Sequence, residues 1–100
     1  MKITQQEGSQ LHITLQGDLG HHEALTALQK IGEEIEAVLP RAVLLDFSQV
    51  TFMDSSGIAV VIQSMKKAKE YGGTLTVQGV SKQAMKVFQA AGIPKIVTFR

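Results

Sequence analysis

The sequence predicts one α/β domain in which helices pack against a mixed β-sheet. Apolar residues alternate with polar ones along some segments, and they recur every three or four residues along others. The two kinds of segment follow one another in the order β-β-α-β-α-β-α-β. Strands separated by helices imply right-handed crossovers. No repeat or linker interrupts the 100 residues, so we expect a single domain over residues 1–100.

The first half of the chain predicts a hairpin followed by a helix. Ile3 begins a strand, Glu7-Gly8-Ser9 forms the turn, and the stretch from Leu11 to Leu15 alternates as a half-buried strand does. From His21 the period becomes helical, and the helix ends before Pro40. The apolar face of this predicted helix consists of Leu25, Leu28, Ile31, Ile35 and Val38.

The second half predicts three more strands and two helices. Residues 42–47 are nearly all apolar, which indicates a central strand covered on much of both faces. A helix follows Asp54 and ends at Gly72-Gly73, and a strand then spans residues 74–78. Ser81 is the expected N-cap of a helix through Ala91, and residues 96–99 form the last strand. The inward residues of the helix after Asp54 are expected to be Ile58, Val61, Ile62, Met65 and Ala68.

Composition excludes several classes of function. Ten Lys and Arg against nine Asp and Glu give a net charge of +1, which is too balanced for a nucleic-acid-binding face. No cysteine is present to form disulfides or thiolate metal sites. The longest apolar run, Ile58–Ile62, is far shorter than the roughly 18 residues of a membrane span, and the N-terminus has no signal-peptide pattern. We therefore expect a cytoplasmic protein that inserts into no membrane.

The segment from Phe52 to Val60 is the most informative for function. It joins a buried strand to a helix and places Ser55 and Ser56 where the helix begins. Unpaired N–H groups and the helix dipole favour an anion there, so a phosphoryl group on a serine would be well accommodated. Alternatively, Asp54 or Ser55 simply caps the helix. The spacing alone favours the capping interpretation.

Metal and hydrolase sites are both poorly supported. His21 and His22 are adjacent and His12 lies on a separate strand, so no metal site is expected. A Ser–His–Asp hydrolase would combine Ser55 with one of the paired histidines and with Asp18 or Asp54. The segment lacks the first glycine of the Gly-x-Ser-x-Gly nucleophile elbow, and the chain has little room for a substrate pocket. We therefore predict that the protein is not an enzyme.

Three stretches of the chain resemble one known family. Residues 52–58, Phe-Met-Asp-Ser-Ser-Gly-Ile, resemble the signature of the anti-sigma factor antagonists, which are bacterial members of the STAS domain family. Residues 17–24, Gly-Asp-Leu-Gly-His-His-Glu-Ala, resemble the family's turn into its first helix. Residues 43–48, Val-Leu-Leu-Asp-Phe-Ser, resemble the strand before the signature. The resemblance covers nearly the whole chain and implies the STAS fold.

The resemblance implies a switch between two protein complexes. In the family, the unphosphorylated antagonist binds an anti-sigma factor that is also a serine kinase of the GHKL type, and the sigma factor is released. The kinase phosphorylates the first serine after the signature aspartate, which corresponds to Ser55, and a PP2C-type phosphatase resets the switch. The nucleotide belongs to the kinase, so this chain needs no cofactor. The implied partner-binding residues are Asp18, His21, His22, Asp54, Ser56, Gly57 and Ile58.

The chain departs from the family pattern in two places. Gly20 stands where many members carry Asp, and relatives tend to continue into a C-terminal helix beyond the position of Arg100. A second function, a STAS subunit of a transport assembly such as a lipid-trafficking complex with no phosphorylation cycle, therefore stays open. The Asp54-Ser55-Ser56-Gly57 signature favours the switch.

Overall fold

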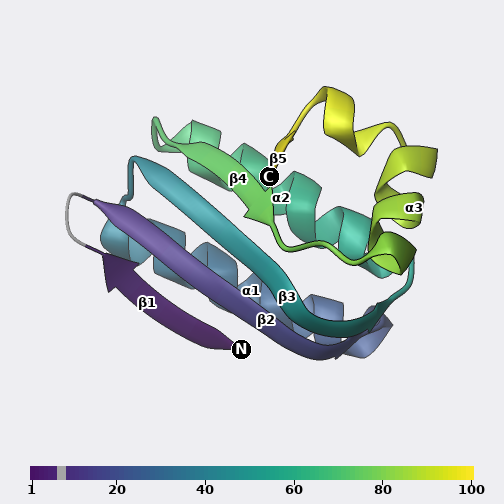
Figure 1. Ribbon diagram of the computed structural model, residues 1–100. Coiled ribbons are helices and arrows are strands. Elements are labelled where there is room, and N and C mark those ends of the chain that lie inside the picture. The colour runs from purple at the N-terminus through teal and green to yellow at the C-terminus, as the bar shows by residue number, and fades with distance from the viewer. Residues whose placement is uncertain (7–8) are drawn as a thin grey trace.

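The fold is a five-stranded mixed sheet with helices packed against it (Figure 1). The computed structural model describes residues 1–6 and 9–100, and the predicted turn at Glu7-Gly8-Ser9 lies largely outside them. The elements are β1 (Lys2–Gln6), β2 (Gln10–Leu19), α1 (His21–Val38), β3 (Ala42–Met53), α2 (Ser56–Glu70), β4 (Thr74–Gln78), α3 (Lys82–Ala90), the 3₁₀ turn η1 (Ile93–Lys95) and β5 (Thr98–Phe99). This order confirms the predicted one.

The sheet follows the sequence order of its strands, β1-β2-β3-β4-β5. β1 is antiparallel to β2, and β2, β3, β4 and β5 are parallel. Parallel neighbours need crossover connections, which α1, α2 and α3 provide. The carboxyl ends of β2 and β3 therefore meet at one edge of the sheet, with Leu19 paired to Met53.

One face of the sheet carries the main core. α1 and α2 lie behind the sheet in Figure 1, and Val43, Leu45 and Phe47 of β3 are buried. The expectation that this strand is covered on much of both faces is confirmed for residues 42–47, because the alternate residues Leu44 and Asp46 are also partly buried. β3 also runs on to Met53, six residues beyond the predicted strand.

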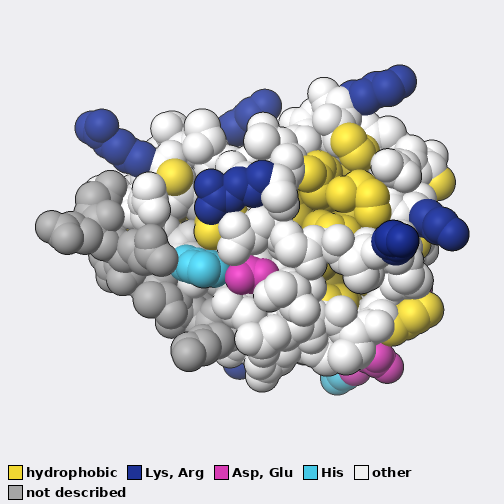
Figure 2. All heavy atoms as spheres, in the orientation of Figure 1, with side chains coloured by type: hydrophobic (Ala, Val, Ile, Leu, Met, Phe, Trp, Pro, Cys, Tyr) yellow, Lys and Arg dark blue, Asp and Glu magenta, His cyan; other side chains and the backbone are white. Residues whose placement is uncertain are grey.

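The open face of the sheet carries a polar ladder across the strands. Figure 2 views this face, where a histidine and an acidic side chain lie side by side. His12 Nε2 is 3.5 Å from Asp46 Oδ2, which also accepts a hydrogen bond from Gln78 Nε2 at 3.2 Å. Burial raises the pKa of Asp46, but hydrogen bonds from Ser48, Gln78 and His12 outweigh burial and hold this pKa below its usual 3.8.

The two predicted helix faces are confirmed in part. The predicted residues that are fully buried are Ile31, Ile35, Val61 and Ala68, and those that pack partly buried against the core are Leu28, Val38, Ile58, Ile62 and Met65. Leu25, expected in the core, is 54% exposed, and α1 buries Ala24, Ala27, Ile31 and Ile35. α2 buries Gly57, Val60, Val61, Ser64 and Ala68, which leaves Ile58, Ile62 and Met65 on its half-buried flank. Both buried stripes include small residues, such as Ala24 on α1 and Ser64 on α2, and a count of large apolar side chains does not detect them.

The C-terminal strand is shorter than predicted. β5 pairs with β4 only through Thr98 and Phe99, and Ile96 is 54% exposed. Gly92 adopts a left-handed conformation with φ of 72°, and the amide of Ile96 donates to the carbonyl of Ile93 within η1. This turn uses the backbone groups that a longer strand would need. By contrast, Ser81 caps α3 as predicted, since its Oγ accepts from the Ala84 amide at 3.1 Å.

Candidate partner-binding site

The candidate site lies at the carboxyl edge of β2 and β3. Gly20 alone separates β2 from α1, and Asp54 and Ser55 alone separate β3 from α2. Two helix N-termini therefore lie next to each other at this edge, which is where open parallel sheets bind their ligands. The structure thus brings together the two stretches around residues 20 and 54 that are far apart in the sequence.

Asp54, not Ser55, caps helix α2 with its side chain. Asp54 Oδ1 accepts a hydrogen bond from the Ser56 amide at 2.8 Å, and the Asp54 carbonyl accepts from Gly57 at 3.1 Å. Ser55 occupies the N-cap position, but its side chain makes no capping hydrogen bond and is exposed. The Ser55 hydroxyl is therefore presented to solvent at the positive end of α2.

Gly57 fixes the approach of α2 to the end of β3. A Cβ at position 57 would lie 2.2 Å from Met53 Sδ and 2.5 Å from Met53 Cγ. Met53 is fully buried, and its backbone is held by Gln83, whose Nε2 donates to the Met53 carbonyl at 2.7 Å and whose Oε1 accepts from the Met53 amide at 3.1 Å. Gly57 thus positions the serines from beneath. The sequence gives no signal for Gln83, because it lies 30 residues from Met53.

Two carboxylates converge on Gly20. A Cβ built at position 20 would lie 3.2 Å from Glu23 Oε1 and 3.6 Å from Asp54 Oδ2. Glu23 was not among the residues expected to form the site. Its carboxylate occupies the space beside Asp54 into which a longer side chain at position 20 would extend.

The other predicted residues lie around this centre. Asp18 Oδ1 accepts a hydrogen bond from Thr51 Oγ1 at 3.0 Å. Asp18 and His22 line a hollow of about 230 Å³ that also includes Met1 and Lys30, whereas His21 is exposed and does not line it.

An apolar groove adjoins Ser55. It has a volume of about 500 Å³ and lies between the start of α2 and α3. Lys86 is the charged member of the groove lining among the described residues. The lining consists of Ser55, Ile58, Lys86, Val87, Ala90 and Ala91. Only Ser55 and Ile58 were predicted to contribute to a site, since the contribution of α3 depends on tertiary packing.

Within residues 1–6 and 9–100, no group of three or more His, Cys, Asp or Glu side chains could hold a metal ion. Among the helices of the same described ranges, none combines the length and the apolar character that crossing a bilayer requires.

The fold and the site together define a small α/β binding module with a serine displayed at a helix N-terminus. The STAS domain model matches residues 1–100, and the chain belongs to the STAS domain family. It is 28% identical over 87 residues to an anti-sigma F factor antagonist of Paenibacillus polymyxa, covering 87% of this chain and 74% of the relative. It is 30% identical over 81 residues to an anti-sigma F factor antagonist of Lysinibacillus sphaericus, covering 81% and 69% of the two chains.

The structure is similar to that of the anti-sigma factor antagonist SpoIIAA in its unphosphorylated form. The TM-score is 0.85 at 25% identity, with 99% of this chain and 86% of that chain covered. The phosphorylated form of the Bacillus cell fate determinant SpoIIAA gives a TM-score of 0.76, also at 25% identity, with 99% and 89% covered. The predicted family and fold are therefore confirmed.

Proposed function

We propose that this chain is an anti-sigma factor antagonist whose binding is controlled by phosphorylation of Ser55. The unphosphorylated form binds an anti-sigma factor that is also a GHKL-type serine kinase, and the bound sigma factor is released. Phosphorylation ends the binding, and a PP2C-type phosphatase restores it. The kinase supplies the nucleotide, so this chain acts as a cytoplasmic binding protein without catalysis or cofactor. Relatives named as anti-sigma factor antagonists support this proposal.

The exposed hydroxyl of Ser55 is the observation that carries the proposal. Asp54 satisfies the Ser56 amide, so Ser55 is left without a capping role and its side chain is exposed. A kinase can therefore reach this hydroxyl without unwinding α2. Ser56 is the matched neighbour: it is half-buried and is the first residue of the helix. This difference favours Ser55 as the phosphoacceptor.

The groove beside Ser55 is the proposed docking surface. Ile58 and Val87 are half-buried and line it together with two alanines, so a partner can bury apolar area there. A partner that covers this groove also covers Ser55. A phosphoserine carries about −1.5 to −2 charges at pH 7, and it would have to lose water inside such an interface.

The acidic pair of Glu23 and Asp54 supplies a charge for a basic partner residue. Many family members carry Asp at the position of Gly20, and in this chain the Glu23 carboxylate lies beside that position. We propose that Glu23 takes over this contact with the partner. The other residues proposed to contact the partner are Asp18, His21, His22, Ser56 and Ile58. Gly57, which the sequence also predicted as a contact, is buried against Met53, and its proposed role is to position the serines.

The proposal is tested with a GHKL-type anti-sigma factor from the same genome. Incubation with this kinase, ATP and magnesium should add one phosphate to the wild-type protein and to Ser56→Ala, and none to Ser55→Ala. Ser55→Ala should bind the kinase in a pull-down as the unmodified protein does. Phosphate on Ser56, or loss of binding in Ser55→Ala, would contradict the proposal. Binding to no such kinase would favour the transport-assembly alternative.

A further inference from the structure

A second groove lies between the bodies of α1 and α2, and the proposed function does not use it. Its volume is about 430 Å³, within the range of roughly 300–1,000 Å³ found for small-molecule sites. None of the residues that line it belongs to the candidate partner-binding site. α1 contributes Leu25, Leu28, Ile31 and Gly32, and α2 contributes Ser64 and Lys67.

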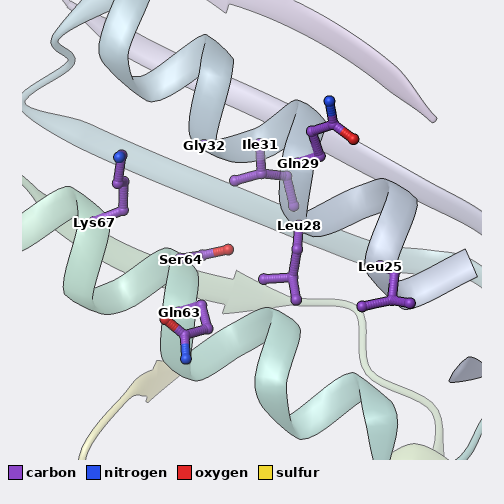
Figure 3. Close-up of a pocket in the computed structure, with 8 residues that line it drawn as sticks. All are labelled: Leu25, Leu28, Gln29, Ile31, Gly32, Gln63, Ser64 and Lys67. Atoms are coloured by element: carbon purple, nitrogen blue, oxygen red, sulfur yellow. The ribbon is translucent and has the colours of Figure 1, made fainter.

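Ser64 is a buried polar group without a partner at this groove. It is 2% exposed, and its Oγ makes no hydrogen bond. Figure 3 shows the hydroxyl pointing from α2 toward Leu28 on α1. A buried hydroxyl without a partner is costly, and the rest of the buried stripe on α2 is apolar or glycine. A ligand that displaces the side chains covering Ser64 Oγ and offers it a hydrogen-bonding group would remove this cost.

The groove offers an apolar surface and room beside that hydroxyl. Leu25 is 54% exposed although it lies on the amphipathic helix α1. A Cβ at Gly32 would meet no atom within 4 Å, so the glycine leaves open space in the wall of the groove. A ligand can therefore cover Leu25 and Leu28 without displacing the backbone of either helix.

The charges at the groove favour a neutral ligand. Lys67 is ion-paired with Glu36 of α1, and the hydrogen bond with Glu36 raises the pKa of Lys67. Its charge is thus already matched. The other polar side chains of the lining, Gln29 and Gln63, are uncharged amides. A carboxylate ligand would lose water here and would meet no unmatched cation.

We propose that this groove binds a small neutral amphiphile. Its apolar body lies against Leu25 and Leu28, and its hydroxyl or carbonyl group forms a hydrogen bond with Ser64 Oγ. The site is separate from Ser55, so the proposal does not depend on the phosphorylation switch.

The test is an NMR titration of the full chain with three probes. Hexanamide should cause saturable amide shifts around Leu28, Gly32 and Ser64, with a dissociation constant on the order of millimolar. Hexanoate has the same alkyl chain but a charge, and it should bind on the order of tenfold more weakly. Acetamide lacks the apolar body and should cause no saturable shift at the groove.

Two variants locate the site. Ser64→Ala should weaken hexanamide binding about fivefold, the worth of one hydrogen bond. Gly32→Leu should fill the groove and abolish the shifts, and it should fold because leucine favours helices more than glycine does. Ala37→Leu, an exposed position on α1 outside the groove, is the matched control and should bind like wild type.

Three results would overturn the proposal. The first is the absence of saturable shifts at the groove with hexanamide. The second is equal hexanamide affinity in wild type and Ser64→Ala. The third is a change in the amide shifts of the groove residues with protein concentration in the absence of any probe, because a second copy of the chain would then occupy the groove.

Discussion

Replacing Gly57 with alanine tests whether close packing beneath the serines positions the start of α2. The new Cβ would lie 2.2 Å from Met53 Sδ, and Met53 is fully buried and cannot swing into solvent. Overpacking of this kind costs about 1–3 kcal/mol. Alanine returns up to about 1 kcal/mol as a better helix former. We therefore expect a net loss of about 1–2 kcal/mol in the free energy of unfolding.

The assay is thermal unfolding followed by circular dichroism. For a domain of this size, about 1 kcal/mol corresponds to a shift of roughly 4–8 °C, so Gly57→Ala should lower Tm by about 5–15 °C. Gly32→Ala is the control with the same chemical change, because a Cβ there meets nothing within 4 Å. It should raise Tm by about 2–8 °C. A Gly57→Ala protein as stable as wild type would refute the packing argument.

Three other substitutions test the site and the polar ladder on the open face of the sheet. Gln83→Ala should cost about 1–2 kcal/mol in urea unfolding, because two hydrogen bonds to Met53 are lost, whereas Gln89→Ala on the same helix should be neutral. The pKa of Asp46 is lowered in the folded state, so its carboxylate stabilises the fold above pH 3.8, and this stabilisation is lost as the pH falls through the folded-state pKa. In Asp46→Asn, the urea midpoint should therefore depend less on pH between pH 2 and pH 5. Glu23→Gln should weaken binding to the kinase about tenfold in calorimetry, and unchanged affinity would show that this carboxylate does not meet a basic partner residue.

The sequence predicts the elements with strong periodicity well. β4 has the expected bounds, and α1 begins at His21 and ends before Pro40 as expected. The errors fall where small residues decide the packing. Ser64 is buried on α2 while Met65 beside it is only half-buried, and the buried face of the helix includes the small residues Gly57, Ser64 and Ala68. The pattern of large apolar residues centres the predicted face about one position further along the helix, on Ile58, Ile62 and Met65.

The sequence also predicts one part of the candidate site and misses another. The chemistry of the site is local, so the segment around Asp54 and Ser55 could be identified from the sequence. The sequence could not show whether Asp54 or Ser55 caps the helix with its side chain, because both residue types cap helices and the two are adjacent. The contribution of α3 depends on tertiary packing, which brings into one groove residues that lie 28 or more positions apart, as Ile58 and Lys86 do. No local pattern carries that information.

The geometry at Ser55 predicts that the proposed phosphorylation would change the surface and not the fold. A phosphate there gains roughly 0.3–1 kcal/mol from the helix N-terminus. Repulsion from the exposed side of the Asp54 carboxylate costs on the order of 1 kcal/mol in water, and an exposed pair with Lys86 returns at most about the same. These contributions nearly cancel, so Tm should stay within a few degrees. Burial of the dianion under a partner instead costs several kcal/mol. A penalty of about 4 kcal/mol weakens binding roughly a thousandfold, so the affinity for the kinase, not the stability of the domain, is where the modification acts.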